Sequence, residues 1–228
     1  MKYEIILFDV DDTLFDFSMS EKTALQHTFL KFGMPTGLTD YHTTYKEISK
    51  ILWSDLEKGN TTLSGLGVER FRRLFFEHSL EIDAAKFNST YLGYLGKETV
   101  LVEGALELCN QLAGCRLAII TNGFTAVQKS RIGSSPLCNT FEHIIISEEV
   151  GSQKPESGIF DYAFSKLDFT DKEKVLIVGD SLTSDIQGGA NYGIDTCWFN
   201  PNYEENSIGT RPTYEIHELM DLLRILRI

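Results

Sequence analysis

Hydrophobic residues gather along the chain in short unbroken runs, a pattern typical of strands buried on both faces of a parallel sheet. Five such runs cover residues 5–8, 117–120, 144–146, 175–178 and 196–199. Helical periodicity lies between and after the later runs and predicts helices over about 104–113, 125–132, 157–167, 184–192 and 215–225. Strands that alternate with helices predict an α/β fold with a parallel sheet and right-handed crossovers.

The stretch from 16 to 99 is different, because it has helical periodicity but no strand-like run. Glycines and other turn residues predict breaks between its helices at 33–35, 58–60 and 64–67. We therefore expect a core domain made of 1–15 and 100–228, into which 16–99 inserts as an all-helical cap domain after the first strand. An insertion at that point would stand above the carboxyl ends of the strands, and its natural role is that of a lid.

Polar residues with catalytic potential follow several of the predicted strands. They are Asp9 and Asp11 after the first run, Thr121 and Asn122 after the second, Lys154 beyond the third, and Asp180 with Asp185 after the fourth. In a parallel α/β sheet, ligands bind beyond the carboxyl ends of the strands. We therefore expect these side chains to converge on one edge of the sheet, although they come from distant parts of the chain.

Asp9, Asp11 and Asp12 crowd directly behind a strand that is predicted to be buried. This arrangement is costly unless a cation or a substrate compensates the charge. Asp9 and Asp11 are two residues apart, so both side chains point to one side of an extended chain. The first could then attack an electrophile while the second exchanges a proton with the leaving group. A capping cluster at a strand-to-helix turn explains one such pair at least as well, and Asp12 fits a capping or solvated role.

The other clusters favour the chemical interpretation. Asp180 and Asp185 add carboxylates to the same edge, and a set of hard oxygen ligands suits Mg²⁺. Thr121 and Asn122 offer a hydroxyl, an amide and backbone N–H groups before a helix, which together can hold an anion. Taken alone, these two residues are more typical of a helix N-cap and turn. Lys154, beside so many carboxylates, would both hold a phosphate and reduce the repulsion.

Charge and composition limit the partners of the protein. The formal net charge is −12, from 33 acidic and 21 basic residues, which argues against a nucleic-acid duplex or an anionic membrane as partner. A small phosphate ester remains compatible, because one pocket can be locally positive on an acidic protein. The four cysteines have no CxxC spacing, and neither a signal peptide nor a membrane-spanning stretch is recognisable. The expected location is the cytoplasm.

The four groups Asp9-Val10-Asp11-Asp12-Thr13, Thr121-Asn122, Lys154-Pro155 and Gly179-Asp180 with Asp185 occur in a fixed order. In order and spacing they resemble the four motifs of the haloacid dehalogenase-like hydrolases, and the resemblance covers essentially the whole chain. It implies a Rossmann-like core with a helical cap inserted after the first strand. It also implies hydrolysis of phosphate monoesters with Mg²⁺ as cofactor.

The resemblance assigns roles position by position. Asp9 would be the nucleophile that forms an aspartyl-phosphate, and Asp11 the general acid and then the general base. Asp9, the backbone carbonyl of Asp11, and Asp180 would bind Mg²⁺.

The remaining motif residues would bind the phosphoryl group or support the site. Thr121, Asn122 and Lys154 would bind the transferring phosphoryl group. Asp185 would support the metal shell and Lys154, and Thr13 would fix the nucleophile loop.

Two further resemblances, one near the end of the chain and one in the predicted cap, narrow the expected substrate class. The segments 195–201 and 211–214, together with Leu52-Trp53, Gly59 and Arg70-Phe71 in the predicted cap, resemble the pyrimidine 5′-nucleotidases with this cap type. This resemblance implies a small phosphorylated metabolite as partner, namely a nucleoside 5′-monophosphate, with pyrimidine nucleotides preferred. We expect a monomer or homodimer. Elsewhere in the cap, Arg70, Arg72 and Arg73 predict a charged helix face, whereas Phe71, Phe75 and Phe76 predict packing within the cap.

Other functions remain as alternatives. A sugar-phosphate or phosphoglycolate phosphatase would use the same scaffold and differ only in its cap. A dehalogenase is disfavoured, because it needs no acid or base at position 11. A phospho-accepting signalling domain also uses strand-end Asp, Thr and Lys around Mg²⁺, but it needs neither Asp11 nor a large lid. A catalytically idle binding protein has no support, because every motif position is filled.

Overall fold

The protein, described here by a computed structural model of residues 2–34, 37–206 and 208–227, divides into two compact units. The core unit consists of Met1–Phe17, Thr99–Thr125 and Ile132–Ile228. The helical unit consists of Ser18–Glu98 and Ala126–Arg131. Sequence patterns predict a helix over 125–132 but do not show that its residues 126–131 belong to the helical unit.

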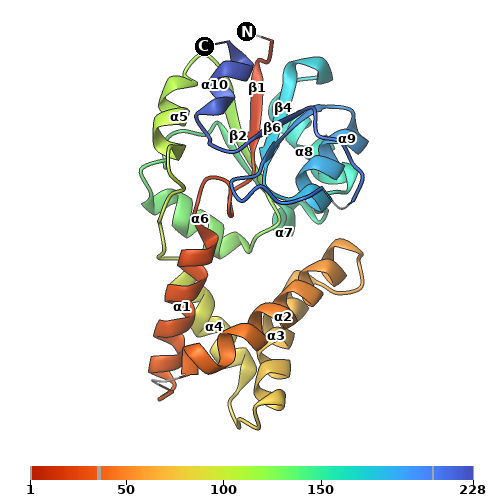
Figure 1. Cartoon of the computed structure of the whole chain (residues 1–228). Helices are drawn as coiled ribbons and strands as arrows, with labels where there is room; N and C mark the ends of the chain where they lie inside the picture. Colours follow the sequence, from red (N-terminus) through yellow and green to blue (C-terminus); the bar gives the residue numbers. More distant parts are fainter. Residues whose placement is uncertain (1, 35–36, 207, 228) are drawn as a thin grey trace. The chain divides into compact units, whose positions relative to one another are not determined.

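A parallel sheet of six strands, in the order β3-β2-β1-β4-β5-β6, forms the centre of the core unit (Figure 1). The strands are β1 (Ile5–Phe8), β2 (Arg116–Thr121), β3 (His143–Ile146), β4 (Val175–Gly179), β5 (Asp195–Phe199) and β6 (Tyr214–Ile216). Every residue of β1 and β4 is buried, as expected for unbroken apolar runs covered on both faces. The predicted α/β fold with a parallel sheet is therefore confirmed.

Helices cover both faces of this sheet. The helices of the core unit are α5 (Ala105–Gln111), α7 (Ser147–Val150), α8 (Ser157–Lys166), α9 (Gln187–Tyr192) and α10 (Asp221–Leu226), whereas most of α6 (Thr125–Ser134) belongs to the helical unit. Alternate residues of β1 point to opposite faces, so Ile6 and Phe8 pack with residues of α5 and α10, whereas Ile5 and Leu7 pack with residues of α8. Figure 1 shows α5 and α10 on one side of the sheet and α8 and α9 on the other.

The end of the core unit differs from the sequence-based expectation. A helix was expected over 215–225, but β6 occupies Tyr214–Ile216 and α10 begins only at Asp221. The pairing of Tyr214 with Cys197 extends the sheet by one parallel strand. A strand of three residues is too short to show a periodicity of its own, so the helical pattern beyond it dominates the sequence signal. The helix expected over 184–192 begins as a π-helical turn, η2 (Leu182–Ile186).

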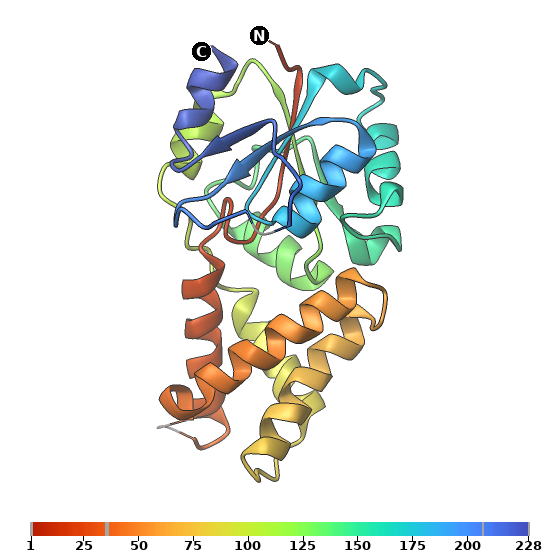
Figure 2. The same cartoon turned by 45° about the vertical axis from the view of Figure 1, so that its right-hand side comes forward.

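Long helices make up most of the described part of the helical unit (Figure 2). They are α1 (Phe17–Lys31), α2 (Gly37–Glu57), α3 (Leu63–Glu77) and α4 (Ala84–Leu95). The predicted break at 64–67 is wrong, because Thr62 caps α3 by accepting a hydrogen bond from Gly65 N, so that these residues form the first turn. Of the break predicted at 33–35, Pro35 lies outside the described residues. No helix in the described parts of the chain is long and apolar enough to cross a membrane.

Arg70 does not lie on a charged helix face, contrary to the expectation from sequence. Arg72 and Arg73 are exposed and pair with Glu69, but the Arg70 side chain is buried with 1% exposure. It donates hydrogen bonds to the Tyr45 hydroxyl at 3.2 Å and to Asn88 Oδ1 at 3.1 Å, and its guanidinium lies over the Tyr91 ring.

The Tyr45 hydroxyl also links this cation to a carboxylate, because it donates to Oε1 of buried Glu21 at 3.0 Å. Burial raises the pKa of Tyr45, and the nearby Arg70 reduces that effect without removing it, so the hydroxyl keeps its proton. One hydroxyl therefore bridges a buried guanidinium and a buried carboxylate in the core of the helical unit.

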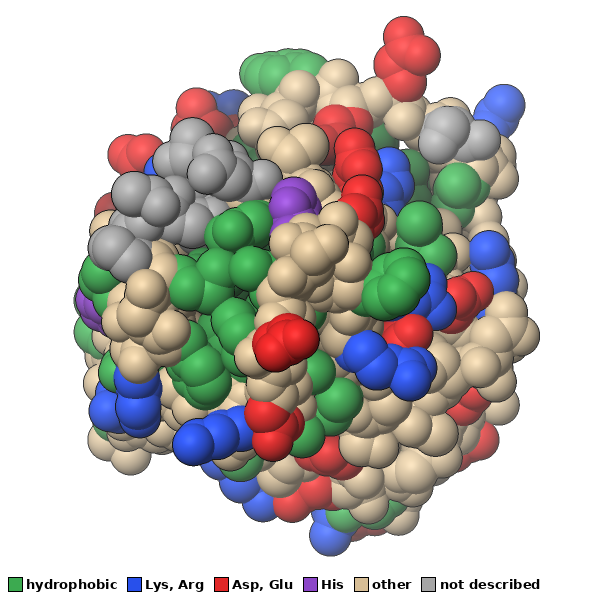
Figure 3. Space-filling model, turned by 90° about the horizontal axis from the view of Figure 1, so that it is seen from below, with side chains coloured by type: hydrophobic (Ala, Val, Ile, Leu, Met, Phe, Trp, Pro, Cys, Tyr) green, Lys and Arg blue, Asp and Glu red, His purple; other side chains and the backbone are tan. Residues whose placement is uncertain are grey.

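Phe76 also differs from the packing that its spacing predicts. Phe71 and Phe75 are buried among the helices, whereas Phe76 is 88% exposed and Ile51 is 55% exposed. Figure 3 shows a face of the molecule on which hydrophobic side chains lie among acidic and basic ones. The expectation of cap packing therefore holds for two of the three phenylalanines.

The bridging hydroxyl gives a stability prediction. Tyr45→Phe keeps the ring but deprives Arg70 and Glu21 of a shared partner, so we expect a loss of about 1–3 kcal/mol in the free energy of unfolding. Urea denaturation followed by circular dichroism measures this loss. The control is Tyr162→Phe on α8, where the ring is 40% exposed and the expected change lies within about 0.5 kcal/mol. Equal losses in the two variants would contradict the bridging role.

Candidate active site

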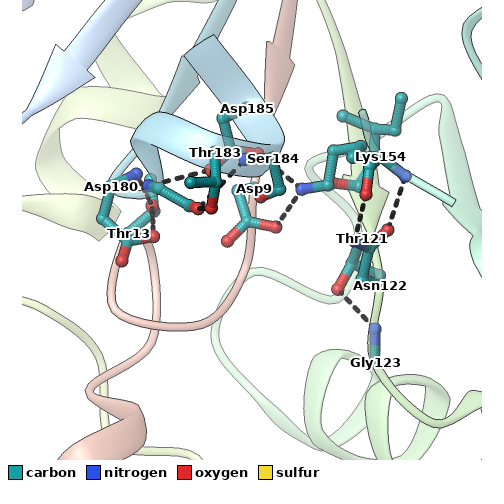
Figure 4. Close-up of polar contacts among 12 residues, drawn as sticks. Asp9, Thr13, Thr121, Asn122, Gly123, Lys154, Asp180, Thr183, Ser184 and Asp185 are labelled. Atoms are coloured by element: carbon teal, nitrogen blue, oxygen red, sulfur yellow. Dashed lines mark hydrogen bonds and ion pairs between the residues drawn. The ribbon is translucent and has the colours of Figure 1, made fainter. Parts of the chain in front are cut away.

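The register of the central strands brings the predicted site residues to one edge of the core unit (Figure 4). Phe8 at the end of β1 lies opposite Ile119 of β2 and Val178 of β4. The residues that follow these three strands therefore emerge side by side. The backbone N–H of Asp9 continues the pairing by donating to Val178 O at 2.9 Å.

Lys154 lies at the centre of this edge and is 1% exposed. Its Nζ is 2.5 Å from Asp9 Oδ1 and 2.6 Å from Asp185 Oδ1. The same Nζ donates to the backbone carbonyl of Ile120 at 2.8 Å. An ammonium has three donors, and these three contacts match them, so the side chain is held in one place.

The carboxylates of Asp9, Asp180 and Asp185 form a compact group. One oxygen from each lies within 4.8 Å of the other two. Burial raises the pKa of Asp9 to about 7, even though the ammonium of Lys154 lowers it. Burial, and then the charges of Asp9 and Asp185, also raise the pKa of Asp180 well above its usual range. Three carboxylates against one ammonium leave two negative charges, which a divalent cation would balance.

Asp185 is a buried carboxylate that is fixed by bonds to the backbone as well as to Lys154. It is fully buried, and its Oδ2 accepts a hydrogen bond from the backbone N–H of Ser181 at 3.1 Å. A Cβ atom on residue 179 would overlap the Asp185 carboxyl group, so only glycine fits at Gly179. The turn after β4 is therefore shaped around this carboxylate.

Two buried side chains fix the position of Asp180. The Thr13 hydroxyl donates to Asp180 Oδ1 at 3.2 Å and accepts from the Asp180 backbone N–H at 3.1 Å. The indole of Trp198 on β5 donates to the Asp180 backbone carbonyl at 2.8 Å. Sequence reasoning singled out Thr13 but gave Trp198 no role at the site. A buried indole N–H needs an acceptor, but only the pairing of Trp198 with Gly179 shows which one it finds.

Thr121 and Asn122 lie at the end of β2, as the sequence predicts. The Thr121 side chain is 2% exposed, and its hydroxyl accepts from Gly123 N at 3.2 Å. The side chain of Asn122 points to the main chain of Lys154, with which it forms two hydrogen bonds. Glu148 of α7, a residue that sequence reasoning did not single out, accepts a hydrogen bond from the N–H of Thr125 at the start of α6.

Asp11 and Asp12 occupy the loop between β1 and α1. Asp11 is half-buried, its backbone bridges to Phe15, and its charge contributes to the raised pKa of Asp9. Asp12 has a positive φ of 56°, and its Oδ1 accepts from the N–H of Phe17 at 3.0 Å. Asp12 thus caps the first turn of α1, whereas Asp11 stays close enough to affect the charge of Asp9.

Comparisons with known proteins agree with this geometry. Residues 3–193 match the family model of the haloacid dehalogenase-like hydrolases. The chain is 38% identical to pyrimidine 5′-nucleotidase PynA of Streptococcus pneumoniae, over 99% of this chain and 96% of PynA. It is 36% identical to pyrimidine 5′-nucleotidase YjjG of Escherichia coli, over 99% of each chain. A crystal structure of the HAD-hydrolase YfnB of Bacillus subtilis bound to magnesium is 38% identical, covers 100% of both chains and has a TM-score of 0.94.

The chain therefore belongs to the haloacid dehalogenase-like hydrolases. Within this superfamily it is a phosphatase, a hydrolase of phosphoric monoesters. Members of the superfamily use Mg²⁺ in general, and the excess of buried carboxylates over ammonium groups at this edge fits such an ion.

The carboxylate group gives a prediction about metal binding. Asp180→Asn removes one of three crowded carboxylates, so in EDTA we expect the variant to melt at a higher temperature than the parent. Mg²⁺ should stabilise the parent, by about 2.7 kcal/mol when its concentration is 100 times the dissociation constant. It should not stabilise the variant. Differential scanning calorimetry with and without Mg²⁺ measures both effects.

The matched control is Asp171→Asn, which changes an exposed carboxylate outside the site where Asn caps equally well. This variant should keep the full gain from Mg²⁺. If Asp180→Asn keeps the same gain, Asp180 is not a ligand.

Proposed function

We propose that the protein is a Mg²⁺-dependent phosphomonoesterase that acts through an aspartyl-phosphate on Asp9. Its substrates are nucleoside 5′-monophosphates, with pyrimidine nucleotides preferred. The observation that carries the chemistry is the buried carboxylate of Asp9, held by Lys154 beside Asp180 at the end of the central strand. The names of PynA and YjjG support the substrate class.

The proposed Mg²⁺ ligands are the carboxylates of Asp9 and Asp180 and the backbone carbonyl of Asp11. When bound, the ion would offset the charge on the phosphoryl oxygens and on the carboxylates. Asp185 supports the site by holding Lys154, since its Oδ1 lies 2.6 Å from Lys154 Nζ. Thr13 holds Asp180 through the two hydrogen bonds described above.

The phosphoryl group binds among Thr121, Asn122 and Lys154. The Thr121 hydroxyl and the backbone N–H groups of this loop donate to phosphoryl oxygens, since they precede the first turn of α6. The ammonium of Lys154 places a positive charge beside them. The same ammonium lowers the pKa of Asp9 and so favours the ionised form that a nucleophile requires.

Hydrolysis takes place in two displacements. In the first, a carboxylate oxygen of Asp9 attacks phosphorus, the bond from phosphorus to the ester oxygen breaks, and Asp11 gives its proton to the departing alkoxide. In the second, the Asp11 carboxylate takes a proton from a water molecule whose oxygen attacks the same phosphorus. The bond from phosphorus to Asp9 then breaks, which releases phosphate and restores Asp9 and protonated Asp11.

Selectivity comes from outside this machinery, because the core site treats every phosphate monoester alike. We propose that residues 16–99 form the cap that recognises the leaving group and excludes water from it. The protein would act in the cytoplasm, since its four cysteines have neither CxxC spacing nor the density of a disulfide scaffold.

The substrate proposal is tested by a panel of monoesters. We expect kcat/KM for UMP or dTMP to exceed that for sugar phosphates and phosphoglycolate, because the cap should bind a nucleoside. Released phosphate, measured with Mg²⁺ present, gives the comparison. A sugar phosphate that wins by tenfold, or about 1.4 kcal/mol, would instead assign the protein to the sugar-phosphate phosphatases.

The roles of the two aspartates are tested by a pair of isosteric variants. Asp9→Asn should abolish activity, because an amide cannot form the aspartyl-phosphate. Asp11→Asn should lose about 10²–10⁴-fold in turnover of a nucleotide, because proton transfer to the alkoxide is removed. With p-nitrophenyl phosphate, whose leaving group needs no proton, Asp11→Asn should give a burst of p-nitrophenolate followed by a slow steady state. Stopped-flow absorbance records the burst, and its absence in both variants would overturn the assignment of Asp11.

A further inference from the structure

The side chain of Asn122 is bonded to the main chain of Lys154 at two points. Asn122 Nδ2 donates to the backbone carbonyl of Lys154 at 2.8 Å, and the backbone N–H of Lys154 donates to Asn122 Oδ1 at 2.9 Å. Both bonds have good lengths. The side-chain amide therefore pairs with both the N–H and the C=O of one residue, as the main chain of a neighbouring strand would.

Lys154 is held by the end of β2 at both ends of its long side chain. Asn122 holds its main chain, and the carbonyl of Ile120, two residues earlier, accepts from its Nζ at 2.8 Å. A lysine side chain has many rotamers, so fixing one end would leave the other mobile. Fixing both ends places Nζ between Asp9 and Asp185.

The amide of Asn122 has little capacity left for another ligand. Its oxygen accepts from the Lys154 N–H, and one of its two N–H groups donates to the Lys154 carbonyl. These two bonds leave one N–H of the side-chain amide for a phosphoryl oxygen. The backbone N–H of Asn122 is a separate donor, which does not depend on the side chain. The side chain therefore makes more bonds to Lys154 than it could donate to the phosphoryl group.

We infer that the side chain of Asn122 is a positioning residue that acts through Lys154, and that it is not itself a principal ligand of the phosphoryl group. This inference rests on the proposed function, in which Lys154 holds Asp9 and binds phosphate. Asn122 thereby couples the loop after β2 to the loop that carries the only cation bonded to Asp9 among the described contacts. A displacement of Nζ by about 1 Å is enough to lower the rate by about 10²-fold.

The chain contains a matched control for the same bonding pattern. Asn200, which is 3% exposed, donates from Nδ2 to the Glu204 carbonyl at 3.0 Å and accepts from the Glu204 N–H at 2.8 Å. It too follows a strand and bridges the main chain of one later residue, but that residue has no part in the proposed chemistry. Asn200→Ala therefore removes two main-chain bonds of the same kind, together with a bond from Nδ2 to Glu215 Oε1 at 2.8 Å, without touching Lys154.

The experiment is a double-mutant cycle on the full chain with Mg²⁺ and p-nitrophenyl phosphate. It compares the parent, Asn122→Ala, Lys154→Met and the double variant, with Asn200→Ala as control. We expect Asn122→Ala to lower kcat/KM by about 10–10²-fold in the parent. In the Lys154→Met background the same substitution should change kcat/KM by less than about twofold, because the residue through which it acts is gone. Asn200→Ala should lower the melting temperature and leave kcat/KM within about twofold of the parent.

Binding of inorganic phosphate gives a readout besides activity. The rise in melting temperature caused by phosphate and Mg²⁺ should be smaller in Asn122→Ala than in the parent. In the Lys154→Met background, adding Asn122→Ala should change this rise no further. A full additional loss there, in kcat/KM or in phosphate binding, would show that Asn122 binds the phosphoryl group by itself and would overturn the inference.

A crystal structure of Asn122→Ala decides the question if Lys154→Met does not fold. Nζ displaced from Asp9 or Asp185, or found in several positions, supports the inference, whereas Nζ still bonded to both carboxylates overturns it. Failure of the underlying proposal is distinguishable, because the parent protein would then release no phosphate with Mg²⁺.

Discussion

The site depends on one buried ammonium. Lys154 lies between the carboxylates of Asp9 and Asp185, and none of the three side chains has much access to water. Burial lowers the pKa of Lys154, but the carboxylates of Asp185 and Asp9 raise it by more, so the ammonium stays charged. Without it, buried carboxylates would take up protons, and Asp9 could not act as a nucleophile. Breaking such a buried pair typically costs several kcal/mol, so stability and chemistry depend on the same contact.

The fold supplies this contact through the register of a parallel sheet. Residues near positions 9, 121 and 180 meet because β1 lies between β2 and β4, whose ends are aligned with its own. Lys154 comes from a loop that follows the edge strand β3, and side chains rather than the sheet tie it to its position. Asn122 holds its main chain and Ile120 its Nζ, while Trp198 and Thr13 hold Asp180. The groups that hold Lys154 and Asp180 therefore come from strands next to their own, whereas Nζ of Lys154 reaches past β2 to Asp9 at the end of β1.

Sequence patterns predict the sheet and the charged residues because both follow from local rules. An unbroken apolar run predicts a buried strand, and a polar residue directly after it predicts a position at the carboxyl edge. The hydrogen-bond partners of individual side chains cannot be predicted in this way, because they depend on the tertiary structure. Arg70 occurs among polar residues of a helix, and only the packing of α2, α3 and α4 shows that Tyr45, Asn88 and Tyr91 enclose it. The targets of Asn122 and Trp198 likewise lie 32 and 18 residues away along the chain, beyond any local pattern.

The central claim is that the carboxylate held by Lys154 carries the phosphoryl group during turnover. The direct measurement is to quench the enzyme in acid while it hydrolyses a nucleotide, reduce the trapped acyl-phosphate with borohydride, and locate the modified residue by peptide mass spectrometry. The account predicts reduction of Asp9 to homoserine, dependent on substrate and on Mg²⁺, with Asp11, Asp180 and Asp185 unmodified. Modification of another aspartate, or active turnover with no trapped residue at all, would contradict it.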